Sequence, residues 1–352
     1  MSVQPEILFE RRGCAGIATL NRPQALNAVT LIMVRALRQQ LDSWRDDPSV
    51  TRVVIMGAGG RAFSAGGDLR QVYELGRSGR QDEALIYWRE EYALNYVIKH
   101  YPKPYVALLD GIVMGGGVGV SLHGSHRVAG DKFLFAMPEV GIGFFPDVGA
   151  TWFLPRMPGE LGTFSAVTGE RLGSADAVSS GIATHRVSSA NIPKLIDALC
   201  EHGPVDQVVA AHAGAREAGP VTARRAVIDR SFVADSIETI LSNLDREAKT
   251  GQPDAQWAEA TAATIRSRSP TSVKLALAQV RWGRARSFAE CMGAEFRIVS
   301  RIVYEHDFYE GVRALIIDKD NQPRWQPATL AEVADKDIER YFLPIGRELQ
   351  LP

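Results

Sequence analysis

Phe63-Ser64-Ala65-Gly66-Gly67-Asp68-Leu69 is the stretch that decides the fold, and a second glycine-rich turn follows it at Met114-Gly115-Gly116-Gly117-Val118-Gly119-Val120. The first turn comes after the apolar run Val53–Met56, and the second comes after the apolar run Tyr105–Leu109. A short apolar run before a glycine turn predicts a buried strand, and each turn leads into a segment with helical potential. Strands that alternate with helices in this order are typical of an α/β protein.

Both turns have a composition that brings backbone amides close to a ligand. Glycine lets the backbone approach a ligand, and the start of a helix presents unpaired N–H groups at the positive end of the helix dipole. Two such N–H groups aimed at one point form an oxyanion hole, which stabilises the charged oxygen of a tetrahedral intermediate. Two carboxylates, Glu139 and Asp147, follow soon after the second turn. An oxyanion hole beside two acids predicts acyl chemistry.

The secondary-structure signals divide the chain into two parts. A hairpin is predicted over residues 7–20, and the strands and helices after it include helices at 30–44 and 82–100 and a helix that starts within 117–123. Strand signals vanish after about residue 192, where four helices are predicted, at 192–200, 236–248, 254–267 and 271–282. We therefore expect an α/β core over residues 1–191 and a mainly helical region over residues 192–352.

The composition argues against several classes of function. The 352 residues carry a formal net charge of -1, so no bulk field draws the protein to nucleic acid or to a membrane surface. The three cysteines lie far apart, which predicts neither a disulfide framework nor a metal site. The segment Met1–Glu10 has neither the apolar core of a signal peptide nor the arginine-rich pattern of a transit peptide. We therefore expect a cytoplasmic protein with no bound metal.

A dinucleotide-binding turn is an alternative that one segment permits. Residues 57–62 follow a predicted strand and fit the pattern G-x-G-x-x-[GA]. Two further glycines follow almost at once, at 66 and 67, and they oppose a helix that would open at this turn. No clear second strand ending in an acidic residue follows about 20 residues later, as that motif requires. We expect a strand followed by a glycine loop instead.

Several motifs, taken together and in order, resemble those of the crotonase superfamily of acyl-CoA enzymes. They lie at residues 61–69, 102–108, 111–117 and 138–139. Further segments are similar to the 3-hydroxyisobutyryl-CoA hydrolase branch of that superfamily, namely 89–92, 144–149, 152–156, 181–185, 269–274, 306–314 and 318–320. The likeness covers nearly the whole chain.

The resemblance implies a spiral of β-β-α units and an acyl-CoA substrate, with no separate cofactor because CoA enters as part of the substrate. It implies that the N–H groups of Gly67 and Gly116 form the oxyanion hole. Glu139 matches the acidic catalytic residue, and Asp147 matches the second acid of the hydrolase branch. The implied substrate site consists of Gly116, Glu139 and Asp147 together with Glu91, Ala65, Asp68 and Leu69. Members of the superfamily commonly assemble through their C-terminal helices, so a homo-oligomer is expected.

The sequence departs from the hydratases of the superfamily at one position. Those enzymes carry a second glutamate two residues after the glycine triplet, where this chain has Gly119. Hydrolysis of a 3-hydroxyisobutyryl or 3-hydroxypropionyl thioester, in valine breakdown, is therefore the expected activity. An enoyl-CoA hydratase or isomerase, with Asp147 in place of the missing acid, is one alternative, and a non-catalytic acyl-CoA-binding protein is another.

Two roles stay open at the level of the sequence. Glu139 could attack the thioester carbonyl directly or act as a base on water. Asp68 directly follows the glycine pair, where a helix cap is a more natural role for it than catalysis.

Overall fold

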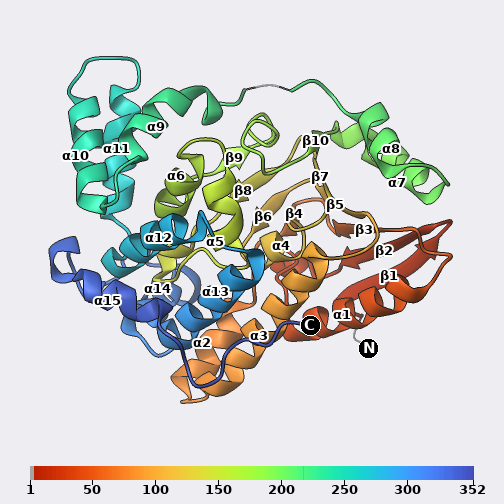
Figure 1. The fold of residues 1–352 in the computed structure, drawn as a ribbon, viewed down its shortest axis with the longest axis horizontal. Coiled ribbons are helices and arrows are strands. Elements are labelled where there is room, and N and C mark those ends of the chain that lie inside the picture. Colours follow the sequence, from red (N-terminus) through yellow and green to blue (C-terminus); the bar gives the residue numbers. More distant parts are fainter. Residues whose placement is uncertain (1–3, 217) are drawn as a thin grey trace.

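Two sheets form the centre of the computed structural model, which describes residues 4–216 and 218–352 (Figure 1). The larger sheet has the strand order β1 (Ile7–Arg12), β2 (Ala15–Leu20), β3 (Arg52–Gly57), β5 (Tyr105–Leu109), β7 (His126–Ala129) and β10 (His185–Arg186). The smaller sheet has the order β4 (Ala62–Ser64), β6 (Ile112–Met114), β8 (Leu134–Ala136) and β9 (Leu172–Gly173). The first three residues of the segment Met1–Glu10 lie outside the described residues.

From β3 to β8, successive strands alternate between the two sheets. β3, β5 and β7 are neighbours in the larger sheet, whereas β4, β6 and β8 are neighbours in the smaller one. Helical structure follows each of these three strands of the smaller sheet. β4 is followed by α2 (Leu69–Arg77) and α3 (Gln81–Lys99), β6 by α4 (Gly116–Gly119), and β8 by the 3-10 helix Glu139–Ile142. The predicted spiral of β-β-α units is thus confirmed.

The direction of the strands explains why distant turns meet. β4 pairs with β6 in parallel, and β6 pairs with β8 in parallel. The carboxyl ends of parallel strands lie at one edge of a sheet. The residues that follow these three strands therefore gather at a single edge, although they are far apart in the sequence.

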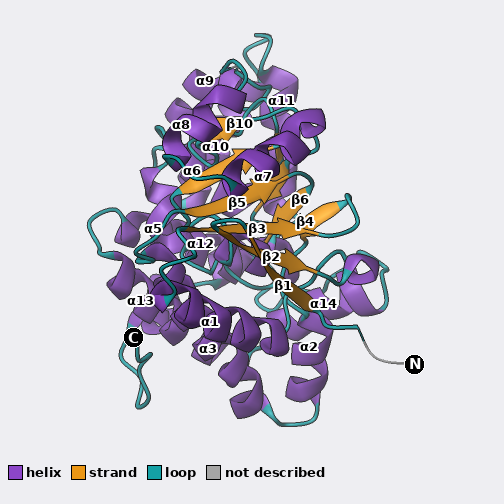
Figure 2. Ribbon diagram, turned by 90° about the vertical axis from the view of Figure 1, so that its right-hand side faces the viewer, coloured by secondary structure: helices purple, strands orange, loops and turns teal. Residues whose placement is uncertain are grey.

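Helices cover both faces of the larger sheet. Successive strand residues point to opposite faces, so Val53 and Ile55 of β3 join one hydrophobic cluster while Val54 joins another. The first cluster contains the buried side of α1 (Leu31–Asp46) and of α3. The second contains residues of α7 (Ile192–Cys200) and α8 (Val205–His212). In Figure 2 β2, β3 and β5 lie between α1 and α3, in the lower half of the view, and α7 and α8, nearer the top.

The remaining helices pack mainly on the side of the smaller sheet, and except for α5 and α6 they follow the last strand in the sequence. Their bounds are α5 (Ala150–Phe153), α6 (Leu161–Thr168), α9 (Arg225–Phe232), α10 (Ile237–Ala248), α11 (Ala255–Arg266), α12 (Pro270–Gly283), α13 (Phe288–Ile302), α14 (His306–Val312) and α15 (Asp335–Glu339). Figure 1 shows α10 and α11 at the far end of the molecule from α7 and α8. The final segment returns to α3, where Arg89 donates a hydrogen bond to the carbonyl of Glu348. Among the described residues, no helix is both long and apolar enough to cross a membrane.

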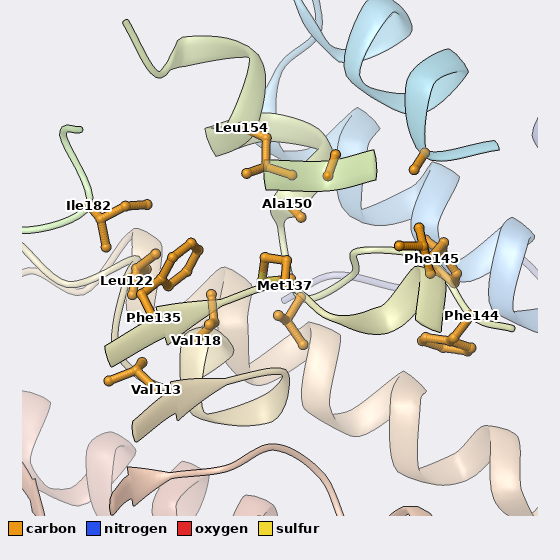
Figure 3. Close-up of a cluster of buried hydrophobic side chains, with 14 of the residues drawn as sticks. Val113, Val118, Leu122, Phe135, Met137, Phe144, Phe145, Ala150, Leu154 and Ile182 are labelled. Atoms are coloured by element: carbon orange, nitrogen blue, oxygen red, sulfur yellow. The ribbon is translucent and has the colours of Figure 1, made fainter. Parts of the chain in front are cut away.

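Figure 3 shows the part of the core that supports the second glycine turn. Val113 of β6, Val118 of α4 and Phe135 of β8 contribute to it, and all three side chains are fully buried. Close packing of this kind resists displacement of the backbone above it. The turn is therefore held by the core rather than by hydrogen bonds of its own side chains.

Candidate active site

A small cavity of about 80 Å³ lies at the edge where β4, β6 and β8 end. Seven of the predicted site residues line it, namely Ala65, Gly67, Leu69, Glu91, Gly116, Glu139 and Asp147. The remaining walls come from the turns and from aromatic side chains, including Tyr87, Trp88 and Phe144. The structure thus brings together residues that the sequence separates by more than eighty positions.

The two glycine turns contact each other through their backbones. A Cβ added to Gly116 would lie 3.3 Å from the amide nitrogen of Gly67, and one added to Gly115 would lie 3.2 Å from the Cα of Gly66. Gly66 has a φ of 125° and Gly115 a φ of 44°, conformations that favour glycine. Within the described residues, the amides of Gly67 and Gly116 donate to no other protein group. Two neighbouring free donors are the arrangement that an oxyanion hole requires.

Glu139 is the first residue after β8 and its short connection, and its carboxylate lies beside the second turn. The side chain is 5% exposed, and its Oε2 has no hydrogen-bond partner within the described chain. Its Oε1 lies 3.7 Å from the position that a Cβ on Gly115 would take. Burial, followed by repulsion from Asp147, raises the pKa of Glu139 well above its ordinary value. A buried carboxylate with an unused oxygen is available to substrate or water.

Asp147 belongs to the loop between the 3-10 helix and α5. Its Oδ2 accepts a hydrogen bond of 2.9 Å from the hydroxyl of Tyr92 on α3. Burial raises the pKa of Asp147 to about 7, against the opposing effect of the Tyr92 hydrogen bond. This carboxyl can therefore act as a hydrogen-bond donor or as an acceptor near neutral pH.

Glu91 is buried, unlike an ordinary helix glutamate. It lies on α3 with 1% of its surface exposed, and its Oε1 accepts a hydrogen bond of 2.9 Å from the hydroxyl of Tyr87. The same oxygen lies 2.7 Å from the position of a Cβ on Gly116. Burial and the charge of Asp147 raise the pKa of Glu91 well above its ordinary value. Glu91, Glu139 and Asp147 therefore form one group of interacting acids.

Glu295 is a fourth buried acid, and the sequence analysis missed it. It lies on α13 and accepts hydrogen bonds from the amides of Gly149, at 2.7 Å, and Thr151, at 2.9 Å. These bonds tie the loop that carries Asp147 to a C-terminal helix, and burial raises the pKa of Glu295 to about 8. The available signal was an acid on the apolar face of residues 288–302, since Met292 and Val299, three positions before and four after it, lie on the same face and are buried.

Asp68 lies outside the cavity lining. Its side chain accepts a hydrogen bond from the amide of Gln71 at the start of α2, and it pairs with Arg22 at 3.1 Å. The expected cap is confirmed, whereas no contact with the cavity supports a substrate-binding role for this side chain. Within the described residues, no group of three or more His, Cys, Asp or Glu side chains is placed to hold a metal ion.

Aromatic side chains close one side of the cavity. Trp88 of α3 stacks on Phe144 with ring centroids 5.7 Å apart, and Phe308 of α14 packs against both rings. The cavity is well below the several hundred Å³ typical of sites for drug-sized ligands. It has the size for a short acyl chain.

Comparison with known proteins agrees with this geometry. A profile of the family described as Enoyl-CoA hydratase/isomerase matches residues 15–342. The chain is 44% identical to the 3-hydroxyisobutyryl-CoA hydrolase, mitochondrial, of Danio rerio, over 98% of this chain and 92% of that protein. It is 42% identical to the protein of the same name from Homo sapiens, over 97% of this chain and 89% of that protein.

Two solved structures share nearly the whole fold. One is a carnitinyl-CoA dehydratase from Mycobacterium thermoresistibile, with a TM-score of 0.92 at 40% identity and a coverage of 99% of both chains. The other is an enoyl-CoA hydratase from Rhodobacter sphaeroides 2.4.1, with a TM-score of 0.91 at 36% identity and a coverage of 99% of this chain and 100% of that chain. With its alternating strands and paired glycine turns, the chain belongs to the enoyl-CoA hydratase/isomerase family, within the crotonase superfamily.

Proposed function

We propose that this protein is an acyl-CoA thioester hydrolase that converts 3-hydroxyisobutyryl-CoA and water to 3-hydroxyisobutyrate and CoA. The observation that carries the proposal is the unpartnered Oε2 of Glu139 beside the free amides of Gly67 and Gly116. The curated relatives from Danio rerio and Homo sapiens, named 3-hydroxyisobutyryl-CoA hydrolases, support it.

The proposed reaction begins with the thioester oxygen accepting hydrogen bonds from the amides of Gly67 and Gly116. Attack on the carbonyl carbon moves charge onto that oxygen, and each donor lowers the barrier by about 3 kcal/mol. In one route Glu139 takes a proton from water, the hydroxide adds to the carbon, the C–S bond breaks and the thiolate receives the proton. In the other route Glu139 adds directly, and the C–S bond breaks to release the CoA thiolate. Water then cleaves the resulting anhydride, which restores Glu139, forms the free acid and supplies the proton that the thiolate takes up. Both routes need the ionised form of Glu139.

The other two acids are proposed to bind the 3-hydroxyl group of the substrate. Asp147 faces the same cavity as Glu139, and its pKa of about 7 lets it accept or donate a hydrogen bond to a hydroxyl. Glu91 lies beside Gly116, with its Oε1 already bonded to Tyr87. A site built to bond a hydroxyl discriminates strongly against an acyl group that lacks one, because its buried polar groups are then unpaired.

Hydration of an enoyl-CoA is the second candidate, since the two solved relatives are named as a dehydratase and a hydratase. The position of the second hydratase glutamate is Gly119 here, and a Cβ at that position would lie 2.7 Å from the Asn95 side chain and 3.0 Å from Val148. The space for such a glutamate is thus occupied by other side chains. This observation favours the hydrolase.

A screen of thiol release tests the substrate class. We expect fast release from 3-hydroxyisobutyryl-CoA and 3-hydroxypropionyl-CoA, and release at least about 100-fold slower from isobutyryl-CoA, which lacks the hydroxyl. Equal rates with and without the hydroxyl would contradict the roles proposed for Asp147 and Glu91.

Three further expectations belong to the same proposal. The substrate supplies CoA, so no separate cofactor is required. We also expect the protein to form a homo-oligomer, which light scattering tests. The place of the reaction in valine breakdown follows from the substrate. The cytoplasmic location stays a prediction, and the vertebrate relatives are named as mitochondrial proteins.

A further inference from the structure

A second pocket, of about 260 Å³, lies apart from the acyl cavity and shares no lining residue with it. It is formed by the end of α3, the start of β7, α5 and the turn before β10. Leu122 and Ile182 line it, and Phe144 lines the acyl cavity. Figure 3 shows these residues at opposite ends of one buried cluster.

Three cations converge on this pocket without a carboxylate. Lys99, Arg127 and Arg156 line it, and no lining residue is acidic. Within the described residues none of the three forms an ion pair with a carboxylate. Arg127 donates to the carbonyls of Ile182 and Gly124, and Arg156 donates to the carbonyls of Trp152, Gly283 and Arg286. The guanidinium groups are thus held in place by neutral acceptors, and their charge is not compensated.

The indole of Trp152 brings the charges close together. The Lys99 ammonium lies 4.0 Å from its ring centroid, and the Arg156 guanidinium lies 4.5 Å from it. Burial, and then repulsion from Arg127 and Arg156, lower the pKa of Lys99. Repulsion among three charges costs free energy, which an anion in the pocket would recover.

We propose that this pocket binds a phosphate group, carried by a small molecule or as the free ion. The guanidinium N–H groups that do not bond backbone carbonyls remain as donors to phosphate oxygens, and the ammonium supplies a third charge. The concave shape favours a small anion over a flat protein surface. Leu122, Phe153 and Met157 add apolar walls, and attraction between charges is stronger beside apolar walls than in open water.

Calorimetric titration at constant ionic strength tests the proposal, because changes in salt would alter screening. Inorganic phosphate is one probe and glucose 6-phosphate, which is no part of CoA, is the other, so that the two arms distinguish the free ion from a phosphorylated small molecule. We expect saturable binding of at least one probe, weakened at least about tenfold by Lys99→Gln and by Arg156→Gln. Lys249→Gln, an exposed lysine elsewhere, is the matched control and leaves binding unchanged.

Thermal unfolding supplies a readout that separates binding from folding. Phosphate raises the Tm of the unaltered protein relative to chloride of equal ionic strength, since a ligand of the folded state stabilises it. Lys99→Gln raises the Tm in chloride, because it removes a repelling charge, and abolishes the gain from phosphate. Two results would overturn the proposal: no saturable binding of either probe, or binding that Lys99→Gln leaves intact. A loss of self-association in Lys99→Gln without phosphate binding would assign the pocket to a second copy instead.

Discussion

Glu139 combines burial with an unpartnered carboxylate oxygen that faces the cavity. Glu139→Gln keeps the size of the side chain and removes both its basicity and its power to attack carbon. We expect thioester hydrolysis to fall by about 100-fold or more, with the fold intact. Thiol release and circular dichroism measure the two effects. Glu259→Gln, at an exposed helix position, is the matched control, and near-normal turnover of Glu139→Gln would refute the catalytic role.

Two substitutions at Gly116 separate the role of its backbone N–H from the effect of adding a side chain. A Cβ here would lie 2.7 Å from Glu91, so both Gly116→Ala and Gly116→Pro disturb that contact. Only proline also removes the N–H, and proline is tolerated in the first turn of a helix. We expect Gly116→Pro to lose about 100-fold more kcat than Gly116→Ala. Equal losses, with similar melting temperatures, would mean that this amide is not in the oxyanion hole.

The pKa of Asp147, which burial raises to about 7, makes the stability of the folded protein depend on pH. The unfolded chain ionises this carboxyl near pH 4, so between about pH 4 and pH 7 the folded state binds more protons than the unfolded state. The contribution of Asp147 to stability is therefore present at low pH and is lost as the pH rises through 7.

The side chain of Asp147→Asn cannot ionise, so the stability of this variant does not fall for that reason as the pH rises. Its amide oxygen can still accept the hydrogen bond from Tyr92. We expect the variant to be more stable than the unaltered protein by about 1–3 kcal/mol at about pH 8, with a difference near zero at about pH 4. Urea unfolding at the two pH values measures it. A variant less stable at both would show that Asp147 contributes stability in its charged form.

At the scale of elements, three consecutive strand ends build the site. The turns after β4, β6 and β8 supply Gly67, Gly116 and Glu139, and parallel pairing brings them to one edge. The sequence predicted the two glycine turns and the acids, because glycine composition and spacing are local. It missed β4 and β6, which have only three residues each and are defined by their partners in the smaller sheet.

The sequence predicted the helix over residues 30–44 more accurately than the helix after the second glycine turn. The predicted helix 30–44 is confirmed as α1, where Thr30 caps the first turn and Val34, Leu37 and Leu41 are buried. The helix expected within 117–123 has only the four residues of α4, since three of those four are glycines. The rejected dinucleotide turn leads into the short strand β4 and not into a helix, so the expectation that no helix opens at this turn is confirmed. Burial of Glu91 depends on tertiary packing around α3, which the local pattern did not reveal.

The link between α13 and the loop after Asp147 makes a prediction of its own. Glu295→Gln keeps one acceptor but turns an amide toward the N–H of Gly149 or Thr151, so the loop should shift. We expect kcat to fall about tenfold. We also expect the pKa of Glu91 to fall, because the charge of Glu295 adds to the effects of burial and of Asp147 that raise it. A loss of activity with an unmoved pKa of Glu91, followed by NMR titration, would indicate a purely structural role.

At the scale of the whole molecule, the two predicted regions share one core. α7 and α8 cover the larger sheet, although they lie beyond the predicted division at residue 191, and α13 and α14 supply Glu295 and Phe308 around the site. The helical region is thus part of the structure that positions the acids. This arrangement agrees with relatives that match nearly the full length of the chain.

The reaction type is the central claim, and the ratio of two rates on one preparation tests it most directly. Gly119 leaves no room for a second glutamate, whereas the paired amides serve a thioester oxyanion in hydrolysis. We predict that kcat/KM for thiol release from 3-hydroxyisobutyryl-CoA exceeds kcat/KM for hydration of crotonyl-CoA by at least about 100-fold, or about 2.7 kcal/mol. Thiol colorimetry and loss of enoyl absorbance give the two values. Faster hydration than hydrolysis would contradict the account and assign the protein to the hydratases.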